Sequence, residues 1–135
     1  VPPIVMRRGE LVQVISNLIT NAIYAMPAGG VLKLTVHEST AAKQKGAILL
    51  VQDNGIGIPE RNLTRIFEPF FTARDSAGTG IGLWVAKNFI EEHAGNIKVE
   101  SIVDSVSHGT KISVFLPLQT PYTPHGSSLS PKFTS

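Results

Sequence analysis

Three short segments between Asn17 and Leu83 carry residue types that suit nucleotide chemistry, and they follow one another in a fixed order. Asn17 and Asn21 are one helical turn apart, and amide oxygens at that spacing can ligate Mg²⁺. Residues 53–59 read Asp-Asn-Gly-Ile-Gly-Ile-Pro, and residues 78–83 read Gly-Thr-Gly-Ile-Gly-Leu. An aspartate in a glycine turn can read a base edge, and a glycine loop before a helix can bind phosphates. Together the three segments predict a nucleotide site, although none is convincing alone.

The first segment lies in a polar stripe of Gln13, Asn17 and Asn21 along one edge of an expected helix. Asparagine is a mediocre helix former, so two of them in mid-helix indicate a task other than helix formation. A neutral amide oxygen can ligate Mg²⁺ while water and phosphates fill the remaining positions. The alternative is an exposed polar stripe without a ligand, and the stripe alone does not decide between the two.

The second segment begins with Asp53 at the end of a predicted buried strand. Gly55 and Gly57 lack the Cβ atoms that would hold a flat ring away from the backbone. The carboxylate of Asp53 can accept a hydrogen bond from the exocyclic amine of adenine, which guanine does not offer at that position. The alternative is a simple hairpin turn, because Asn54-Gly55 favours a tight turn and Asp often begins one.

The third segment has alternating glycines and leads into the helix that carries Trp84. Its amide hydrogens and the helix N-terminus could face phosphate oxygens. It is not a Walker loop, because no Gly-Lys-Ser/Thr follows, and Leu83 stands where a dinucleotide fingerprint needs its third glycine. The alternative is a glycine linker without a ligand.

An aromatic segment, residues 66–74, lies between the two glycine segments. Its aromatic residues, which we expect to be core or hinge anchors, are Phe67, Phe70 and Phe71. They would hold residues 72–79 as a lid over the nucleotide. Arg74 could then approach the terminal phosphate, with a solvated arginine as the alternative.

Hydrophobic periodicity indicates the elements that must position these segments. The expected elements are a helix over 10–26, strands over 31–37 and 47–52, a short helix over 59–67, a helix over 81–93 that closes near Ala94-Gly95, and strands over 96–102 and 110–116. We expect His93 to cap the end of its helix rather than act in catalysis. Because short loops join several strands, we predict an α+β fold, a two-layer sandwich in which a mixed, largely antiparallel sheet is covered on one face by helices.

Composition limits the possible classes of protein. The 135 residues carry a net charge of +2 and include no cysteine. This length suits a single domain, 1–118, and the Pro- and Ser-rich residues 119–135 predict a flexible tail. Scattered charges do not indicate a nucleic-acid partner, and four widely spaced histidines do not indicate a zinc site. The longest aliphatic run, 47–51, is too short to cross a bilayer, so we expect a cytoplasmic setting without membrane contact.

These segments together resemble the catalytic, ATP-binding domain of bacterial two-component sensor histidine kinases, within the ATPase superfamily that includes gyrase, Hsp90 and MutL. The resemblance runs from about Ile4 to Leu118 and includes an asparagine box at 17–22, both glycine boxes and the phenylalanine box between them. Residues 25–30 and the short lid are most similar to the nitrogen-regulator subgroup. The resemblance implies a Bergerat-type fold with Mg²⁺ and ATP as cofactors.

The resemblance also implies a role for each matching residue. Asn21 is the expected Mg²⁺ ligand, Asp53 reads adenine, and Asn17 and Arg74 act in catalysis beside the phosphates. Thr110 would reach adenine through a water molecule. The other residues expected to contact ATP are Tyr24, Ala25, Gly55, Gly57, Ile58, Phe71, Thr72, Gly78, Thr79, Gly80, Ile81, Gly82 and Leu83.

Three positions depart from the pattern of the family. Arg74 replaces a frequent lysine, Tyr24 stands where a basic or amide side chain is common, and an acidic residue is replaced around Arg7. Relatives of the gyrase type that hydrolyse ATP have glutamate at the place of Asn17, where it activates water. Asparagine cannot act in this way, so the resemblance implies very slow hydrolysis by the domain alone.

A phosphoacceptor histidine is absent from this sequence. In these kinases the acceptor is followed by an acidic residue and a proline, and none of the four histidines has that setting. We therefore expect a larger protein in which an upstream dimerisation domain carries the histidine, with a response regulator as an indirect partner and ATP or ADP as the ligand. Two alternatives share the fold: an anti-sigma-factor serine kinase, and a non-catalytic nucleotide-binding module.

Overall fold

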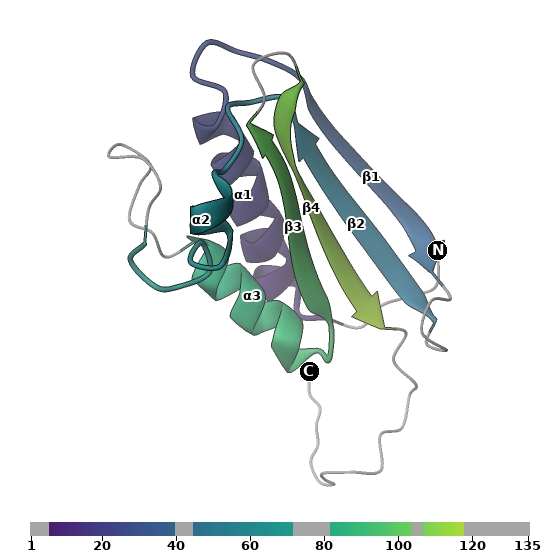
Figure 1. The fold of residues 1–135 in the computed structure, drawn as a ribbon. Coiled ribbons are helices and arrows are strands. Elements are labelled where there is room, and N and C mark those ends of the chain that lie inside the picture. The colour runs from purple at the N-terminus through teal and green to yellow at the C-terminus, as the bar shows by residue number, and fades with distance from the viewer. Residues whose placement is uncertain (1–5, 40–44, 72–81, 104–106, 118–135) are drawn as a thin grey trace, which may run out of the picture.

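A computed structural model describes residues 6–39, 45–71, 82–103 and 107–117 of the chain. The elements in chain order are α1 (Arg8–Tyr24), β1 (Leu32–Ser39), β2 (Gly46–Asp53), α2 (Glu60–Leu63), α3 (Gly82–Glu92), β3 (Asn96–Val103) and β4 (His108–Pro117). The strands form one sheet in the order β1-β2-β4-β3, and each neighbouring pair is antiparallel. Figure 1 shows the helices together on one side of this sheet, which confirms the predicted two-layer α+β fold.

The hydrophobic core lies between the two long helices and the central strands. α1 packs on β2, and α3 packs on β3 and β4 as well as on α1. Buried positions in each helix recur every four residues, so each helix turns one apolar stripe toward the sheet. The buried residues of this core are Val14, Leu18, Ala86 and Ile90 from the helices and Val51, Ile112 and Val114 from the sheet.

The alternation of apolar and polar residues in β1 is typical of a half-buried strand, but the strand is more exposed than that. Leu34 and Val36 are 41% and 56% exposed. Leu34 pairs with Val51, so its side chain lies on the same sheet face as the core. β1 is an edge strand of the sheet, however, and the helices pack over the other three strands. The alternation therefore identified the correct face, but it could not indicate that the described helices pack mainly over the other strands.

The segment after β2 contains less helix than predicted for residues 59–67. Beyond α2, the backbone N–H groups of Arg65 and Glu68 donate to carbonyl oxygens three residues earlier, each at 2.9 Å. This spacing is that of consecutive turns rather than of an α-helix. Phe70 is 76% exposed with a φ of 69°, so it is not a core anchor, and the other expected role, as a hinge anchor, stays a prediction. Within residues 59–71 the buried residue is Ile66.

α3 ends where the sequence predicted. Ala94 has a left-handed φ of 62°, and the N–H of Gly95 donates to the carbonyl of Ile90 at 3.0 Å. This bond closes the helix in the manner of a Schellman motif. A Cβ atom on Gly95 would collide with the carbonyl oxygen of Phe115. Glycine is therefore required at 95 for the approach to β4, and the left-handed conformation falls on an alanine.

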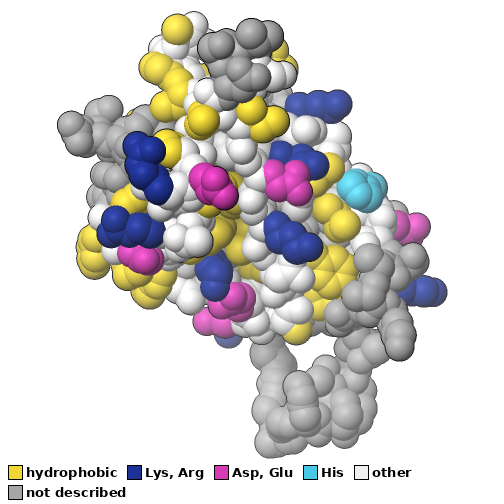
Figure 2. All heavy atoms as spheres, viewed as in Figure 1, with side chains coloured by type: hydrophobic (Ala, Val, Ile, Leu, Met, Phe, Trp, Pro, Cys, Tyr) yellow, Lys and Arg dark blue, Asp and Glu magenta, His cyan; other side chains and the backbone are white. Residues whose placement is uncertain are grey.

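The described part of the chain has no helix that is long and apolar enough to cross a membrane. On the face of the molecule in Figure 2, basic and acidic side chains are interspersed, with apolar side chains between them. That face therefore carries no stripe of a single charge sign.

Candidate nucleotide site

One end of the sheet carries a row of polar side chains on the face that the helices cover. Asp53 pairs with Thr110, and Thr110 pairs with Ser101 on the next strand. Side chains in register point to the same face of a sheet, and Asp53 shares the face of Val51 two residues earlier. Thr110 is buried, and its hydroxyl lies 2.9 Å from that of Ser101. The carboxylate expected to read a base therefore lies in one row with a hydrogen-bonded pair of hydroxyl groups.

Asp53 also takes part in the turn that follows it. The N–H of Gly55 donates to Oδ1 of Asp53 at 2.8 Å, which is the geometry of an Asx turn. This is the turn role considered as the alternative from the sequence. A carboxylate has about four acceptor sites on its two oxygens, so this bond to the turn does not by itself exclude a role in base reading. Base reading by Asp53 stays a prediction.

The glycines of this turn are required by contacts inside the protein. A Cβ atom on Gly55 would collide with the carbonyl group of Ala25, and one on Gly57, where φ is +79°, would collide with that of Ile102. The N–H of Ile56 donates to the carbonyl of Ala25 at 2.9 Å. The absent Cβ atoms thus let the turn pack between the end of α1 and β3. The sequence had suggested another reason for these glycines, the close approach of a flat ring.

Two side chains that no local sequence pattern indicated hold the turn in place. The hydroxyl oxygen of Ser101 accepts a hydrogen bond from the N–H of Ile58 at 2.6 Å and donates to the carbonyl of Gly109 at 2.9 Å. Nδ1 of His108 donates to the carbonyl of Gly55. His108 and Gly55 are 53 positions apart in the sequence. Only the folded sheet brings them together.

Asn17 and Asn21 lie on one edge of α1, as predicted, and both are half-buried, but their side chains differ in their partners. Nδ2 of Asn17 donates to the carbonyl of Gly82 at 2.9 Å, and its Oδ1 accepts from Nε2 of Gln13 at 2.8 Å. Asn17 therefore ties α1 to the first residue of α3. The side chain of Asn21 has no hydrogen-bond partner within the described ranges, so its amide is available to a ligand.

The metal-ligating oxygen atoms on this edge of α1 suit a metal ion that binds together with a phosphate ligand rather than one held by protein side chains alone. The described residues contain no group of three or more His, Cys, Asp or Glu side chains that could hold a metal ion. Mg²⁺ bound to phosphates keeps several waters and takes only one or two protein oxygens. Oδ1 of Asn21 can be such an oxygen.

A cavity of about 650 Å³ that is widely open to solvent lies between α1 and α3. We call it the α1–α3 cavity, and its lining includes Glu10, Gln13 and Asn17 from α1 and Gly82, Val85 and Phe89 from α3. The helices run antiparallel beside it, because Asn17 meets Gly82 at one end and Glu10 approaches His93 at the other. The cavity therefore begins at the Asn17–Gly82 contact and continues toward the N-terminus of α1.

His93 caps the C-terminal end of α3, as the sequence predicted. Its Nδ1 lies 2.9 Å from the carbonyl oxygen of Phe89, and its Nε2 lies 3.8 Å from Oε1 of Glu10. Arg7 lies 3.5 Å from the other oxygen of Glu10. These contacts hold the end of α3 against the start of α1.

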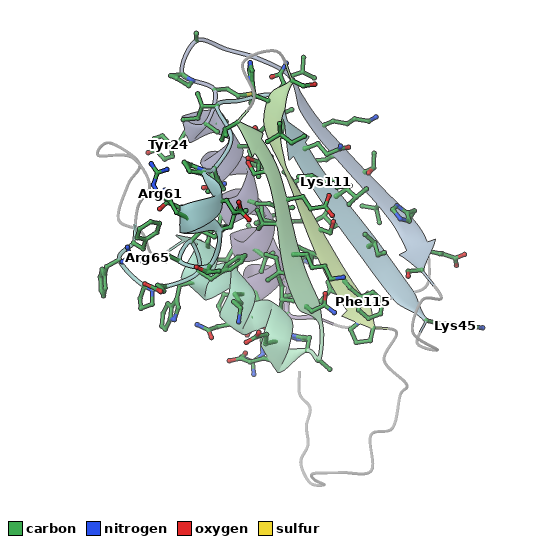
Figure 3. The ribbon with its side chains drawn as sticks, in the orientation of Figure 1. Tyr24, Lys45, Arg61, Arg65, Lys111 and Phe115 are labelled. Carbon is green, nitrogen blue, oxygen red and sulfur yellow. The ribbon has the colours of Figure 1, made fainter. Side chains whose placement is uncertain are left out.

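Some of the remaining residues predicted to contact ATP lie within the ranges that the structure describes, and others lie outside them. Tyr24 ends α1 and is 43% exposed, and Figure 3 shows it on the helix side of the molecule with Arg61 and Arg65. Phe71 is half-buried, with the guanidinium of Arg65 4.5 Å from the centre of its ring. Leu83 packs against the core. The predicted residues that lie outside the described ranges are Thr72, Arg74, Gly78, Thr79, Gly80 and Ile81, together with the rest of the lid and the tail from 119.

Comparison with known proteins gives consistent matches over most of the chain. A family model described as "Histidine kinase-, DNA gyrase B-, and HSP90-like ATPase" matches residues 6–120. Sporulation kinase E of Bacillus subtilis (strain 168) is 40% identical over 119 residues, which are 88% of this chain and 15% of that protein. The mycobacterial sensor histidine kinase MprB superposes with a TM-score of 0.74 at 28% identity, over 84% of this chain and 76% of that one. Full-length ShkA in complex with AMPPNP superposes with a TM-score of 0.72 at 25% identity, over 92% of this chain and 25% of that one.

Proposed function

The chain belongs to the family of histidine kinase-, DNA gyrase B- and HSP90-like ATPases, and we propose that it binds Mg-ATP and donates the γ-phosphoryl group to a histidine on another domain of a sensor kinase. The chain spans only 15% of the length of sporulation kinase E. The acceptor would lie in the part of a larger protein that corresponds to the remainder of such relatives. A response regulator would then be an indirect partner, and a cytoplasmic setting belongs to the same proposal.

The observation that carries the proposal is the convergence of three separate elements on one site. Asp53 and Thr110 lie in register at the end of the sheet, and the turn after Asp53 packs on the end of α1. The edge of α1 carries Asn21 with an available amide and Asn17 in contact with the start of α3. The base would lie at the Asp53 end and the phosphates between Asn21 and the N-terminus of α3, where backbone N–H groups favour anions. ShkA, which superposes on this chain, binds the ATP analogue AMPPNP.

The residues of this site would act by binding and positioning. Oδ1 of Asn21 would hold Mg²⁺, which neutralises charge on the phosphate oxygens during phosphoryl transfer. Asn17 has one free hydrogen on Nδ2 after its bond to Gly82, and this hydrogen could donate to a phosphate oxygen. Neither amide can remove a proton from water. The site would therefore favour transfer to an aligned acceptor over hydrolysis.

Labelling with radioactive ATP tests this proposal directly. The full-length protein, or this domain mixed with its dimerisation domain, is incubated with γ-labelled ATP and Mg²⁺, and the labelled product is treated with acid or alkali. Phosphohistidine is labile in acid and stable in alkali, whereas phosphoserine has the opposite behaviour. We expect acid-labile label on the dimerisation domain. Alkali-labile label would favour the serine kinase alternative, and ATP binding without any label would favour a non-catalytic module.

The relatives reported above bear on these alternatives. Sporulation kinase E, MprB and ShkA align with this chain over most of its length, and MprB is named as a sensor histidine kinase. A serine kinase is accordingly the less favoured function. The nitrogen-regulator subgroup stays a prediction from residues 25–30 and the short lid.

A further inference from the structure

We propose that His108 is a positioning residue for base selection: it holds Gly55, and the N–H of Gly55 holds the carboxylate of Asp53. This inference rests on the proposed function, because it concerns the base end of the same site. His108 acts through the turn after β2 rather than by contact with the nucleotide. It adds to the site a residue from the start of β4 that no sequence motif indicated.

The turn after β2 lies across the end of the sheet where β3 finishes and β4 begins, as Figure 1 shows. Residues 53–58 contact four residues there, which we call the β3–β4 end: Ser101, Ile102, His108 and Gly109. At the start of the turn, Gly109 lies so close to Asp53 that a Cβ atom on the glycine would collide with the aspartate carbonyl. At its end, the N–H of Ile58 donates to Ser101 at 2.6 Å. Both ends of the turn are therefore fixed against β3 and β4.

His108 joins the β3–β4 end to the residue that holds the carboxylate. The N–H of Gly55 donates to Oδ1 of Asp53 at 2.8 Å, and the carbonyl oxygen of Gly55 accepts from Nδ1 of His108. Glycine has a wide choice of backbone conformations, so its own preferences do not fix the direction of its N–H. The bond from His108 restricts that choice. His108 thus restrains the hydrogen bond that orients the carboxylate of Asp53.

The peptide group between Gly55 and Ile56 is held from two sides. Its N–H, that of Ile56, donates to the carbonyl of Ala25 at 2.9 Å, and its carbonyl oxygen accepts from His108. The end of α1 therefore supplies one restraint and β4 supplies the other. Without His108 the bond to Ala25 remains, so the turn should stay folded while this peptide group is free to tilt. We therefore expect the loss of His108 to disturb base selection more than stability.

The contact with Gly55 requires one tautomer of the imidazole ring. A carbonyl oxygen only accepts hydrogen bonds, so Nδ1 of His108 must carry the hydrogen. In a neutral ring Nε2 then carries none. The tautomer of His108 is therefore a signature of this contact that can be observed without changing the protein.

The test compares His108→Ala with His108→Asn. Alanine removes the donor, whereas Nδ2 of asparagine can occupy the place of Nδ1 and keep the bond to Gly55. His37→Ala is the matched control, because His37 is an exposed histidine of β1 on the sheet face away from the helices. Each variant is titrated by calorimetry with ATP and with inosine triphosphate, which carries an oxygen in place of the exocyclic amine of adenine.

We expect His108→Ala to weaken ATP binding about 3- to 10-fold, the effect of one hydrogen bond, and to leave the weaker binding of inosine triphosphate unchanged. The preference for ATP then falls by the same factor. His108→Asn should restore most of this preference, and His37→Ala should not change it. A purely structural role for His108 would instead weaken the binding of both nucleotides alike and lower the melting temperature.

Nuclear magnetic resonance of the wild-type protein provides a measurement that needs no variant. Correlation spectra of the ring nitrogens and carbon-bound hydrogens distinguish a histidine with its hydrogen on Nδ1 from one with its hydrogen on Nε2. We expect the hydrogen of neutral His108 on Nδ1. A hydrogen on Nε2 would remove the donor to Gly55 and overturn the inference.

The outcomes distinguish this inference from the proposed function. If the wild-type protein binds neither nucleotide, the proposed function fails and this inference fails with it. If the wild-type protein prefers ATP and His108→Ala keeps the full preference, the function stands and the role of His108 is overturned. Equal losses for ATP and inosine triphosphate, or no recovery in His108→Asn, would also overturn that role while leaving the function in place.

Discussion

Replacing Gly55 by alanine should destabilise the domain because this glycine lies against the end of α1. A Cβ atom at position 55 would lie 2.7 Å from the carbonyl carbon and 2.9 Å from the Cβ of Ala25, and closer still to the carbonyl oxygen. These atoms belong to the backbone and to a buried methyl group, so no rotamer change can relieve the contact. Overpacking of this kind costs about 1–3 kcal/mol.

Gly82→Ala is the matched control for this prediction. The nearest atom to a Cβ at position 82 belongs to Asn17 and is 3.5 Å away, which is an ordinary van der Waals contact. Gly82 is also the first residue of α3, and alanine favours a helix over glycine by up to about 1 kcal/mol. The same chemical change should therefore destabilise the protein at position 55 and leave it unchanged or more stable at position 82.

Thermal unfolding followed by circular dichroism measures both effects. For a domain of this size, 1 kcal/mol corresponds to about 3–5 °C, so Gly55→Ala should lower the melting temperature by about 3–15 °C. Gly82→Ala should not lower it. Equal melting temperatures for Gly55→Ala and the wild type would refute the packing argument for the turn, and so would an equal loss in both variants.

Three further predictions follow from individual contacts. Asn21→Ala should abolish the dependence of ATP affinity on Mg²⁺ in calorimetry, and an unchanged Mg²⁺ dependence would remove Asn21 as the metal ligand. Asp53→Asn keeps an acceptor for the turn but loses the charge, so ATP should bind about 10- to 100-fold more weakly with little change in melting temperature; equal affinity would exclude base reading by Asp53. Ala94→Gly relieves a left-handed φ of 62° and should stabilise the protein by about 1 kcal/mol, whereas Ala28→Gly, in a turn without positive φ, should not.

Local patterns in the sequence were sufficient to place the main elements of the fold. The four-residue spacing of Val14, Leu18 and Ala22 gives α1 its buried stripe, and the same periodicity places Asn17 and Asn21 on its edge. Periodicity is a property of neighbouring residues, so it is readable before folding. The two-layer arrangement follows from the alternation of these helices with short-looped strands.

Contacts between distant segments could not be predicted in this way. The bond from His108 to Gly55 and the role of Ser101 beneath Ile58 depend on the register of β3 and β4, which no local pattern specifies. The exposure of Val36 depends on which strands the helices cover. Glycine is required at position 55 because a Cβ atom there would collide with Ala25. The sequence indicated which residues have a structural or binding role, but their contacts depend on tertiary packing.

A calorimetric titration of the domain with ATP, with and without Mg²⁺ and with GTP for comparison, tests directly whether this site binds Mg-ATP. We expect saturable binding of one ATP per chain, strengthened by Mg²⁺, with GTP at least tenfold weaker because guanine lacks, at that position, the amine that Asp53 would bind. A domain that is folded by circular dichroism but binds GTP as tightly as ATP, or binds neither, would contradict it.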